Sequence, residues 1–314
     1  MDNKNVNHVC AHDGDSVSHL GGGVDGAVNA LAPYNGGLVA GGAFIRALQY
    51  GGSSLDSGGL AWWDPSGQWR LIGGAQVSGV VLAALVNGTK LYVGGRFDSL
   101  GAGALGQAAS TSLAMFNGTE WSSLGPEGWP GSDVMALASS DDDLYVSGMY
   151  DGSVTGDGAR VARWDGSSWI VLGEFDGAVR SVAVLGGRVY AGGDFKTVEG
   201  MEVMGLTRFS EGLWEPVGGG VRGGGVFALT AAENCVYCES ESLSLSSFLS
   251  CQFSCAAALS IDFTLSWEPC RITYTTCALL FPPPPHISHS LLLLTQIRQP
   301  PTLLPRIQLA ALST

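Results

Sequence analysis

Residues 179–218 read VRSVAVLGGRVYAGGDFKTVEGMEVMGLTRFSEGLWEPVG, and this stretch decides the fold. It opens with a short apolar strand, turns at a Gly pair and continues into a second strand that ends in Gly-Gly-x-Phe. After a loop, the chain returns through a hairpin in which a Phe and a Trp flank a turn, and it closes on Val-Gly. The pattern therefore predicts four strands in one unit.

The unit recurs along the chain. Its first strands begin at Val28, Leu82, Val134, Val179 and Val226, in steps of 54, 52, 45 and 47 residues. A period of about 40 to 50 residues with four antiparallel strands is typical of a propeller blade, whereas solenoid repeats are mostly shorter and helical. We therefore expect an all-β fold, a β-propeller of four-stranded blades.

The strongest signals within the copies are an aromatic pair and a Gly pair, which is Ser147-Gly148 in the third copy. Because the second strands are apolar on both faces, they should be buried between neighbouring blades. Glycine there allows close approach of a neighbour, so bulky residues at Gly94 or Gly192 should destabilise the fold. The aromatic pairs should pack blades together rather than bind a ligand. They are Trp63/Trp69, Phe116/Trp121, Trp164/Trp169 and Phe209/Trp214.

The two ends of the repeat region are incomplete copies. Residues 9–21 match the third and fourth strands of a blade, and residues 226–238 match the first and second. With four complete copies between them, the two half-blades could pair and close the ring at five blades, which would hide the sheet edges. The alternative is an open arc from a propeller of six to eight blades.

Composition marks a boundary after residue 238. All 47 glycines lie at or before Gly225, and residues 239–314 contain none. We therefore divide the chain into a β-propeller region, residues 1–238, and an irregular, low-complexity tail, residues 239–314. The tail is rich in Ser, Leu and Pro without periodicity. This composition favours a disordered segment or an artefact of the gene model.

Charge and targeting signals narrow the partner and the location. Residues 1–238 carry 12 Lys and Arg against 24 Asp and Glu, a net charge of −12, which disfavours nucleic acid as a partner. The first residues lack the apolar core of a secretory signal. Residues 242–261 are uncharged but contain seven serines, which argues against a membrane span. Location stays open between the cytoplasm and, if the amino terminus is truncated, the cell surface or exterior.

Three patterns invite a metal site, and each has a simpler explanation. His8, Cys10 and His12 alternate along a strand, but His12 stands where other copies have Trp. The Cys235-x2-Cys238 and Cys251-x3-Cys255 pairs have zinc-like spacing without a Gly-rich knuckle. The Asp run at residues 141–143 lacks the alternating carboxylates of a calcium loop and fits a hairpin tip. We expect no metal and no cofactor.

The repeat resembles known propeller families. Gly-Gly, a loop, and Trp63-Asp64-Pro-x3-Trp69 resemble the kelch repeat. The form LYVGGxF followed by WxxLG is similar to galactose-oxidase-like propeller repeats, including those of fungal cortical cell-polarity (bud-site selection) marker proteins. The resemblance implies the fold and a cell-surface location. It does not imply copper chemistry, because residues 20–285 contain no histidine for the copper ligands. Residues 165–169 also depart from the Asp-box order of sialidases.

These observations favour a non-catalytic binding or scaffold module over the alternative, a propeller hydrolase or oxidase with an unrecognised active site. No residues are assigned a catalytic role. The loops after the second and fourth strands emerge on one face of the ring, and we expect a protein or glycan partner there. The candidate residues are Trp129, Tyr50, Asp151 and Asp157. The alternative for Trp129 is that its ring covers the end of a blade.

Overall fold

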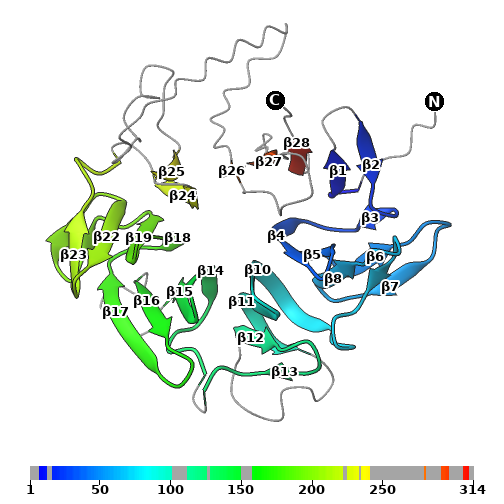
Figure 1. Cartoon of the computed structure of the whole chain (residues 1–314), viewed down its shortest axis with the longest axis horizontal. Coiled ribbons are helices and arrows are strands. Elements are labelled where there is room, and N and C mark those ends of the chain that lie inside the picture. The colour runs from blue at the N-terminus through cyan, green and yellow to red at the C-terminus, as the bar shows by residue number, and fades with distance from the viewer. Residues whose placement is uncertain are drawn as a thin grey trace, which may run out of the picture.

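The computed structural model describes residues 7–12, 16–100, 112–125, 128–149, 158–221, 225–232, 235–240, 279–280, 291–296 and 307–310. Every secondary-structure element in this part of the chain is a β-strand, which confirms the all-β class. The sheets are arranged around a ring like the blades of a propeller, with the first strand of each blade nearest the centre (Figure 1).

Four sheets match the four complete copies, and their strands pair antiparallel in chain order. Blade 1 contains β4 (Val28–Tyr34), β5 (Gly37–Gly42), β8 (Leu60–Trp63) and β9 (Trp69–Arg70). Blade 2 contains β10 (Val77–Asn87), β11 (Lys90–Leu100), β12 (Leu113–Phe116) and β13 (Trp121–Ser122). Blade 3 contains β14 (Val134–Ser140), β15 (Asp143–Met149), β16 (Ala159–Trp164) and β17 (Trp169–Phe175). Blade 4 contains β18 (Val179–Leu185), β19 (Arg188–Gly193), β22 (Leu206–Ser210) and β23 (Leu213–Pro216).

The two half-blades are present as separate two-stranded sheets. They are β1 (Cys10–His12) with β2 (Val17–His19), and β24 (Val226–Ala232) with β25 (Cys235–Ser240). Three short tail strands, β26 (Leu279–Leu280), β27 (Leu291–Gln296) and β28 (Ile307–Ala310), form a further sheet. These tail strands lie between the half-blades, since β26 contacts β24 and β28 contacts β1 (Figure 1). Closure at five blades therefore stays a prediction, as does the boundary at residue 238.

Two of the predicted loops contain hairpins that pair back onto the preceding blade. Strands β6 (Arg46–Leu48) and β7 (Ser54–Asp56) join β3 (Gly23–Val24), which follows the first half-blade. Strands β20 (Thr197–Val198) and β21 (Met201–Glu202), from the loop of blade 4, add to β17 of blade 3. Since they cross from one blade to the next, these hairpins stabilise the order of blades around the ring.

An aspartate before the first strand holds each of these hairpins in place. The Asp25 carboxylate accepts hydrogen bonds from the backbone N–H groups of Ile45 and Arg46, both at 2.8 Å. Asp176 does the same for Lys196 and Thr197, also at 2.8 Å. Burial alone would raise the pKa of Asp25, but these backbone bonds and the Arg46 side chain outweigh it and lower that pKa.

The Gly pair of the second strand provides contact with the next blade. A Cβ at Gly41, Gly94 or Gly192 would lie closer than van der Waals contact allows to a valine in the first strand of the next sheet. Blade 3 has Ser147 at this position, fully buried, and its hydroxyl donates to the Val179 carbonyl at 3.1 Å. The predicted sensitivity of Gly94 and Gly192 therefore has a direct physical cause.

The Trp of each hairpin joins its blade to the preceding one. Its indole Nε1–H donates to the carbonyl of the residue before a glycine at the end of the preceding fourth strand. The four bonds are Trp69 to Leu20 at 2.9 Å, Trp121 to Ile72 at 2.9 Å, Trp169 to Leu124 at 3.1 Å and Trp214 to Leu172 at 2.8 Å. The partner aromatic of each pair lies 5.1–5.3 Å away, ring centroid to ring centroid. The predicted packing role of the aromatic pairs is confirmed.

Candidate functional site

The structure describes two of the four predicted site residues, Trp129 and Tyr50. Asp151 and Asp157 lie outside the described residues. Tyr50 contacts blade 1 and the first half-blade, whereas Trp129 packs between blades 2 and 3. Tyr50 and Trp129 therefore lie at two separate places in the described part of the chain.

Trp129 is buried at the junction of blades 2 and 3. Its side chain is 7% exposed and packs with Leu124 and Val134. Its ring makes an edge-on contact with Trp169, with the centroids 5.4 Å apart. The indole N–H has no hydrogen-bond partner among the described residues. This geometry matches the alternative in which Trp129 covers the end of a blade, and its role in binding stays a prediction.

Tyr50 is the exposed aromatic residue of the predicted set. Its side chain is 59% exposed at the tip of the β6–β7 hairpin. Its hydroxyl donates to the His19 carbonyl at 2.5 Å, and its ring lies edge-on to Trp63 with centroids 5.9 Å apart. Tyr50 is therefore held in one position with much of its ring facing solvent, which suits a contact residue.

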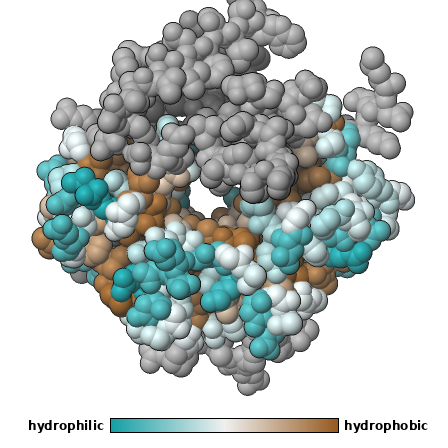
Figure 2. All heavy atoms as spheres, in the orientation of Figure 1, coloured by the Kyte–Doolittle hydropathy of each residue, from teal (hydrophilic) through white to brown (hydrophobic). Residues whose placement is uncertain are grey.

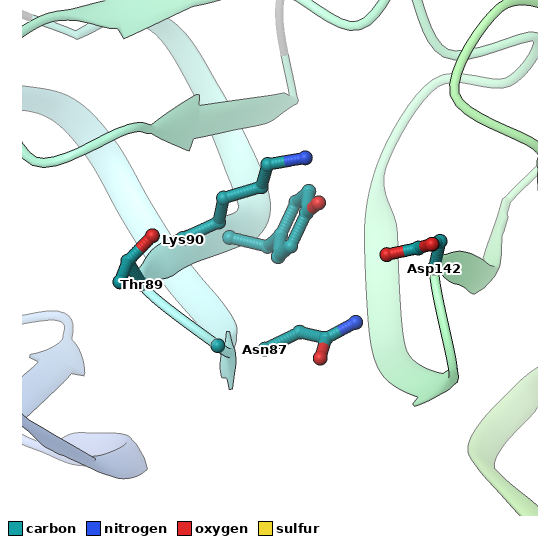
Figure 3. Close-up of a pocket in the computed structure, with 6 residues that line it drawn as sticks. Asn87, Thr89, Lys90 and Asp142 are labelled. Atoms are coloured by element: carbon teal, nitrogen blue, oxygen red, sulfur yellow. The ribbon is translucent and has the colours of Figure 1, made fainter.

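A pocket of about 220 Å³ lies where the first hairpin turns of blades 2 and 3 meet (Figure 3). It is lined by Asn87, Gly88, Thr89, Lys90, Tyr92 and Asp142. The Asn87 side chain donates to the Asp141 carbonyl at 2.7 Å and so joins the two turns. Lys90 and Asp142 come from the two adjacent blades and give the pocket one cation and one carboxylate (Figure 3).

The surroundings of Tyr92 in this pocket favour the protonated form of its phenol. Burial raises the pKa of Tyr92, and the nearby negative charge of Asp142 raises it further. The phenol therefore stays protonated at neutral pH and is able to donate a hydrogen bond. A volume of about 220 Å³ is also below the roughly 300–1,000 Å³ of most small-molecule sites.

This pocket was not predicted from the sequence, because binding was expected at the long loops on the other face of the ring. Turns between first and second strands emerge opposite the long loops, and they were interpreted only as tight turns. The turn prediction is correct, since Gly88 has a φ of 60° and Asp141 one of 51°. Lys90 and Asp142 stand at the corresponding turns of successive copies, and this placement was the available signal.

The carboxylates with the most strongly lowered pKa values belong to hairpin turns. Hydrogen bonds from the Ser66 hydroxyl and the Arg70 side chain lower the pKa of Asp64 to about 2. Asp165 accepts from the backbone and hydroxyl groups of Ser168 and Ser167, and these bonds lower its pKa. Both carboxylates stay ionised and stabilise the turn between the two aromatic residues, so their perturbation is structural.

The metal alternatives gain no support from the part of the chain that the structure describes. Within it, no group of three or more His, Cys, Asp or Glu side chains is arranged to hold a metal ion. No helix in the same part is long and apolar enough to span a bilayer.

Comparison with known proteins adds little. No protein-family model matches the chain, and no curated protein matches it. The computationally designed protein Ika8 is similar in structure with 19% identity over 68% of each chain, at a TM-score of 0.39. The structure of YjhT is similar with 15% identity over 66% of this chain and 74% of its own, at a TM-score of 0.42. Likeness this weak carries no argument, so the fold rests on the sheets described above.

Proposed function

We propose that this protein is a non-catalytic β-propeller binding or scaffold module with kelch-like, galactose-oxidase-like repeats. The proposal rests on the fact that structural residues and variable residues are separate in this chain. In every complete copy the hairpin Trp contacts the preceding blade, and the first residue of the Gly pair, or Ser147 in blade 3, contacts the next sheet. The connections between the strands differ in length and composition from copy to copy, as binding loops on a rigid scaffold do.

The partner is a protein or a glycan. The net charge of −12 over residues 1–238 favours a neutral or basic partner and disfavours nucleic acid. Tyr50, 59% exposed and fixed by its hydroxyl bond to His19, supplies an aromatic anchor of the kind that dominates interfaces. The pocket at Lys90 and Asp142 would accept a polar group of the same partner or of a second one.

We further propose that the ring closes at five blades, with the first half-blade supplying the third and fourth strands that the last half-blade lacks.

A role similar to that of fungal cell-polarity markers, at the cell surface, is the biological setting that the repeat pattern supports. Figure 2 shows an opening at the centre of the ring, with hydrophobic residues along much of the coloured part of its rim and hydrophilic residues over much of the coloured outer surface.

The test is a binding measurement with two families of probe. The purified chain is applied to a glycan array and to immobilised candidate protein ligands, and hits are titrated by calorimetry. We expect saturable binding without conversion of the ligand, weakened by Tyr50→Ala or by Lys90→Glu. Arg188→Glu is the matched control, because Arg188 holds the same turn position in blade 4 as Lys90 does in blade 2. The proposal would be contradicted if no probe bound, or if neither Tyr50→Ala nor Lys90→Glu weakened binding.

The alternative, a propeller hydrolase or oxidase, has a separate test. A screen with glycoside, ester and alcohol substrates should show no turnover above the buffer rate. Turnover that Asp142→Asn or another Asp-to-Asn change abolishes would establish the enzyme instead.

A further inference from the structure

Each complete blade has a pair of small, fully buried residues at one matching position where its second and third strands meet. The opposed residues in the four blades are Ala40 and Ala61, Val93 and Ala114, Val146 and Ala162, and Ala191 and Thr207. All eight side chains are 0% exposed. In all four blades the position is therefore filled by small side chains, at the same register of the two strands.

Two cysteines occupy these positions in the half-blades. In β25, Cys238 follows Tyr237 as Val146 follows Tyr145 in β15. At the other end of the chain, Val9-Cys10 in β1 repeats Val161-Ala162 in β16. Cys238 stands at the second-strand position and Cys10 at the third-strand position, and each is 6% exposed.

The half-blades are complementary in strand content as well. The sheet of β24 and β25 contains first and second strands only, and the sheet of β1 and β2 contains third and fourth strands only. We propose that β25 pairs with β1 to complete a fifth blade. Cys10 and Cys238 then lie directly opposite each other and form a disulfide that links the two ends of the ring. This inference rests on the proposed closure at five blades and is independent of the proposed binding activity.

The geometry of such a pair suits a disulfide. Opposed residues in an antiparallel sheet have Cα atoms about 4.5–5.5 Å apart, within the roughly 4.4–6.8 Å that disulfides span. Pairing requires the tail strands to leave the gap, since β28 contacts β1 and β26 contacts β24 in the structure. With oxidised glutathione as the oxidant, one protein thiolate displaces glutathione to give a mixed disulfide, and the second thiolate displaces the other glutathione. Two protein thiols are oxidised and two glutathione thiols are released.

The experiment is refolding of the full chain in a glutathione redox buffer, followed by thiol blocking and peptide mapping by mass spectrometry. We expect a peptide pair linked through Cys10 and Cys238 within a monomer, as judged by size-exclusion chromatography. Cys10→Ser and Cys238→Ser each abolish the link. Cys235→Ser, on the same strand but at its turn end, leaves the link intact.

A register control makes the test sharper. In Cys10→Ser/Ala11→Cys the thiol moves one residue along β1 and onto the opposite face of the sheet, so its link to Cys238 should fall by at least tenfold. Reduced Cys10 and Cys238 in folded protein, an interchain link, or equal linking from residue 11 would overturn the proposal. Resistance of residues 9–237 to limited proteolysis in Cys10→Ser/Cys238→Ser would then show whether closure survives without the bond. Ligand titration of the same variant reports on the binding function separately.

Discussion

Gly173→Ala tests the contact between blades 3 and 4. Gly173 follows Leu172, whose carbonyl accepts the Trp214 indole N–H at 2.8 Å. A Cβ at Gly173 would lie closer to Trp214 Nε1 than van der Waals contact allows, and 3.0 Å from Trp214 Cδ1. The φ of Gly173 is not positive, so the backbone itself accepts alanine and the clash is the only penalty.

The expected magnitude follows from two terms. Overpacking in a tight core costs about 1–3 kcal/mol. Displacement of the indole also breaks its hydrogen bond, which contributes about 0.5–1.5 kcal/mol. We therefore expect Gly173→Ala to lower the free energy of unfolding by about 2–4 kcal/mol, measured by urea denaturation followed through tryptophan fluorescence.

Gly219→Ala is the matched control. Its φ is also not positive, and a Cβ there would meet nothing within 4 Å. Removal of backbone freedom from the unfolded chain should make this change neutral or stabilising by up to about 1 kcal/mol. In a Trp214→Phe background, which removes the clashing nitrogen, the cost of Gly173→Ala should shrink. A Gly173→Ala protein within about 0.5 kcal/mol of the unsubstituted chain would refute the reasoning.

Three further predictions follow from single contacts. Ser147→Ala should lower the free energy of unfolding by about 1–2 kcal/mol in urea denaturation, because the buried hydrogen bond from the Ser147 hydroxyl to the Val179 carbonyl is lost. An unchanged midpoint would show that this bond does not stabilise the fold. The stabilisation from Asp64 should be complete above the unfolded-state pKa of about 4 and lost as pH falls towards about 2, because the folded state lowers its pKa. Asp64→Asn should therefore flatten the pH dependence of stability across that window, and an unaltered pH profile would contradict it. Trp129→Ala should lower the melting temperature by several degrees, since removal of a buried Trp costs about 3–5 kcal/mol. An unchanged melting temperature would instead favour the predicted binding role of Trp129.

The main features of the blade fold could be predicted because they are repeated in the sequence. The period placed each first strand, although β10 begins at Val77 rather than Leu82, since residues 77–81 pair with the extended end of β11. The Gly pairs and aromatic pairs were assigned correctly to packing. Their partners could not be predicted from one copy, because the acceptor of each indole N–H lies 42 to 49 residues earlier, in another blade.

Other features escaped prediction for local reasons. The strands of the added hairpins are only two or three residues long, too short for a periodic pattern. The Asp-Gly-Ala-Val sequences that begin at Asp25 and Asp176 were a usable signal for them. Trp129 was chosen because the repeat pattern does not require it, yet that pattern contains no information on burial. The pocket depends on the approach of two turns 54 residues apart, joined by Asn87 and Asp141.

Hydrogen exchange of the tryptophan indole N–H groups, followed by NMR and assigned with single Trp→Phe variants, tests the central structural claim most directly. Binding on a rigid ring requires that each blade be joined to its neighbour, and the bonds of Trp69, Trp121, Trp169 and Trp214 are the repeated joint. The account predicts that these four indole N–H groups exchange slowly and lose protection together as the chain unfolds. Exchange of all four at the rate of an exposed indole would contradict it.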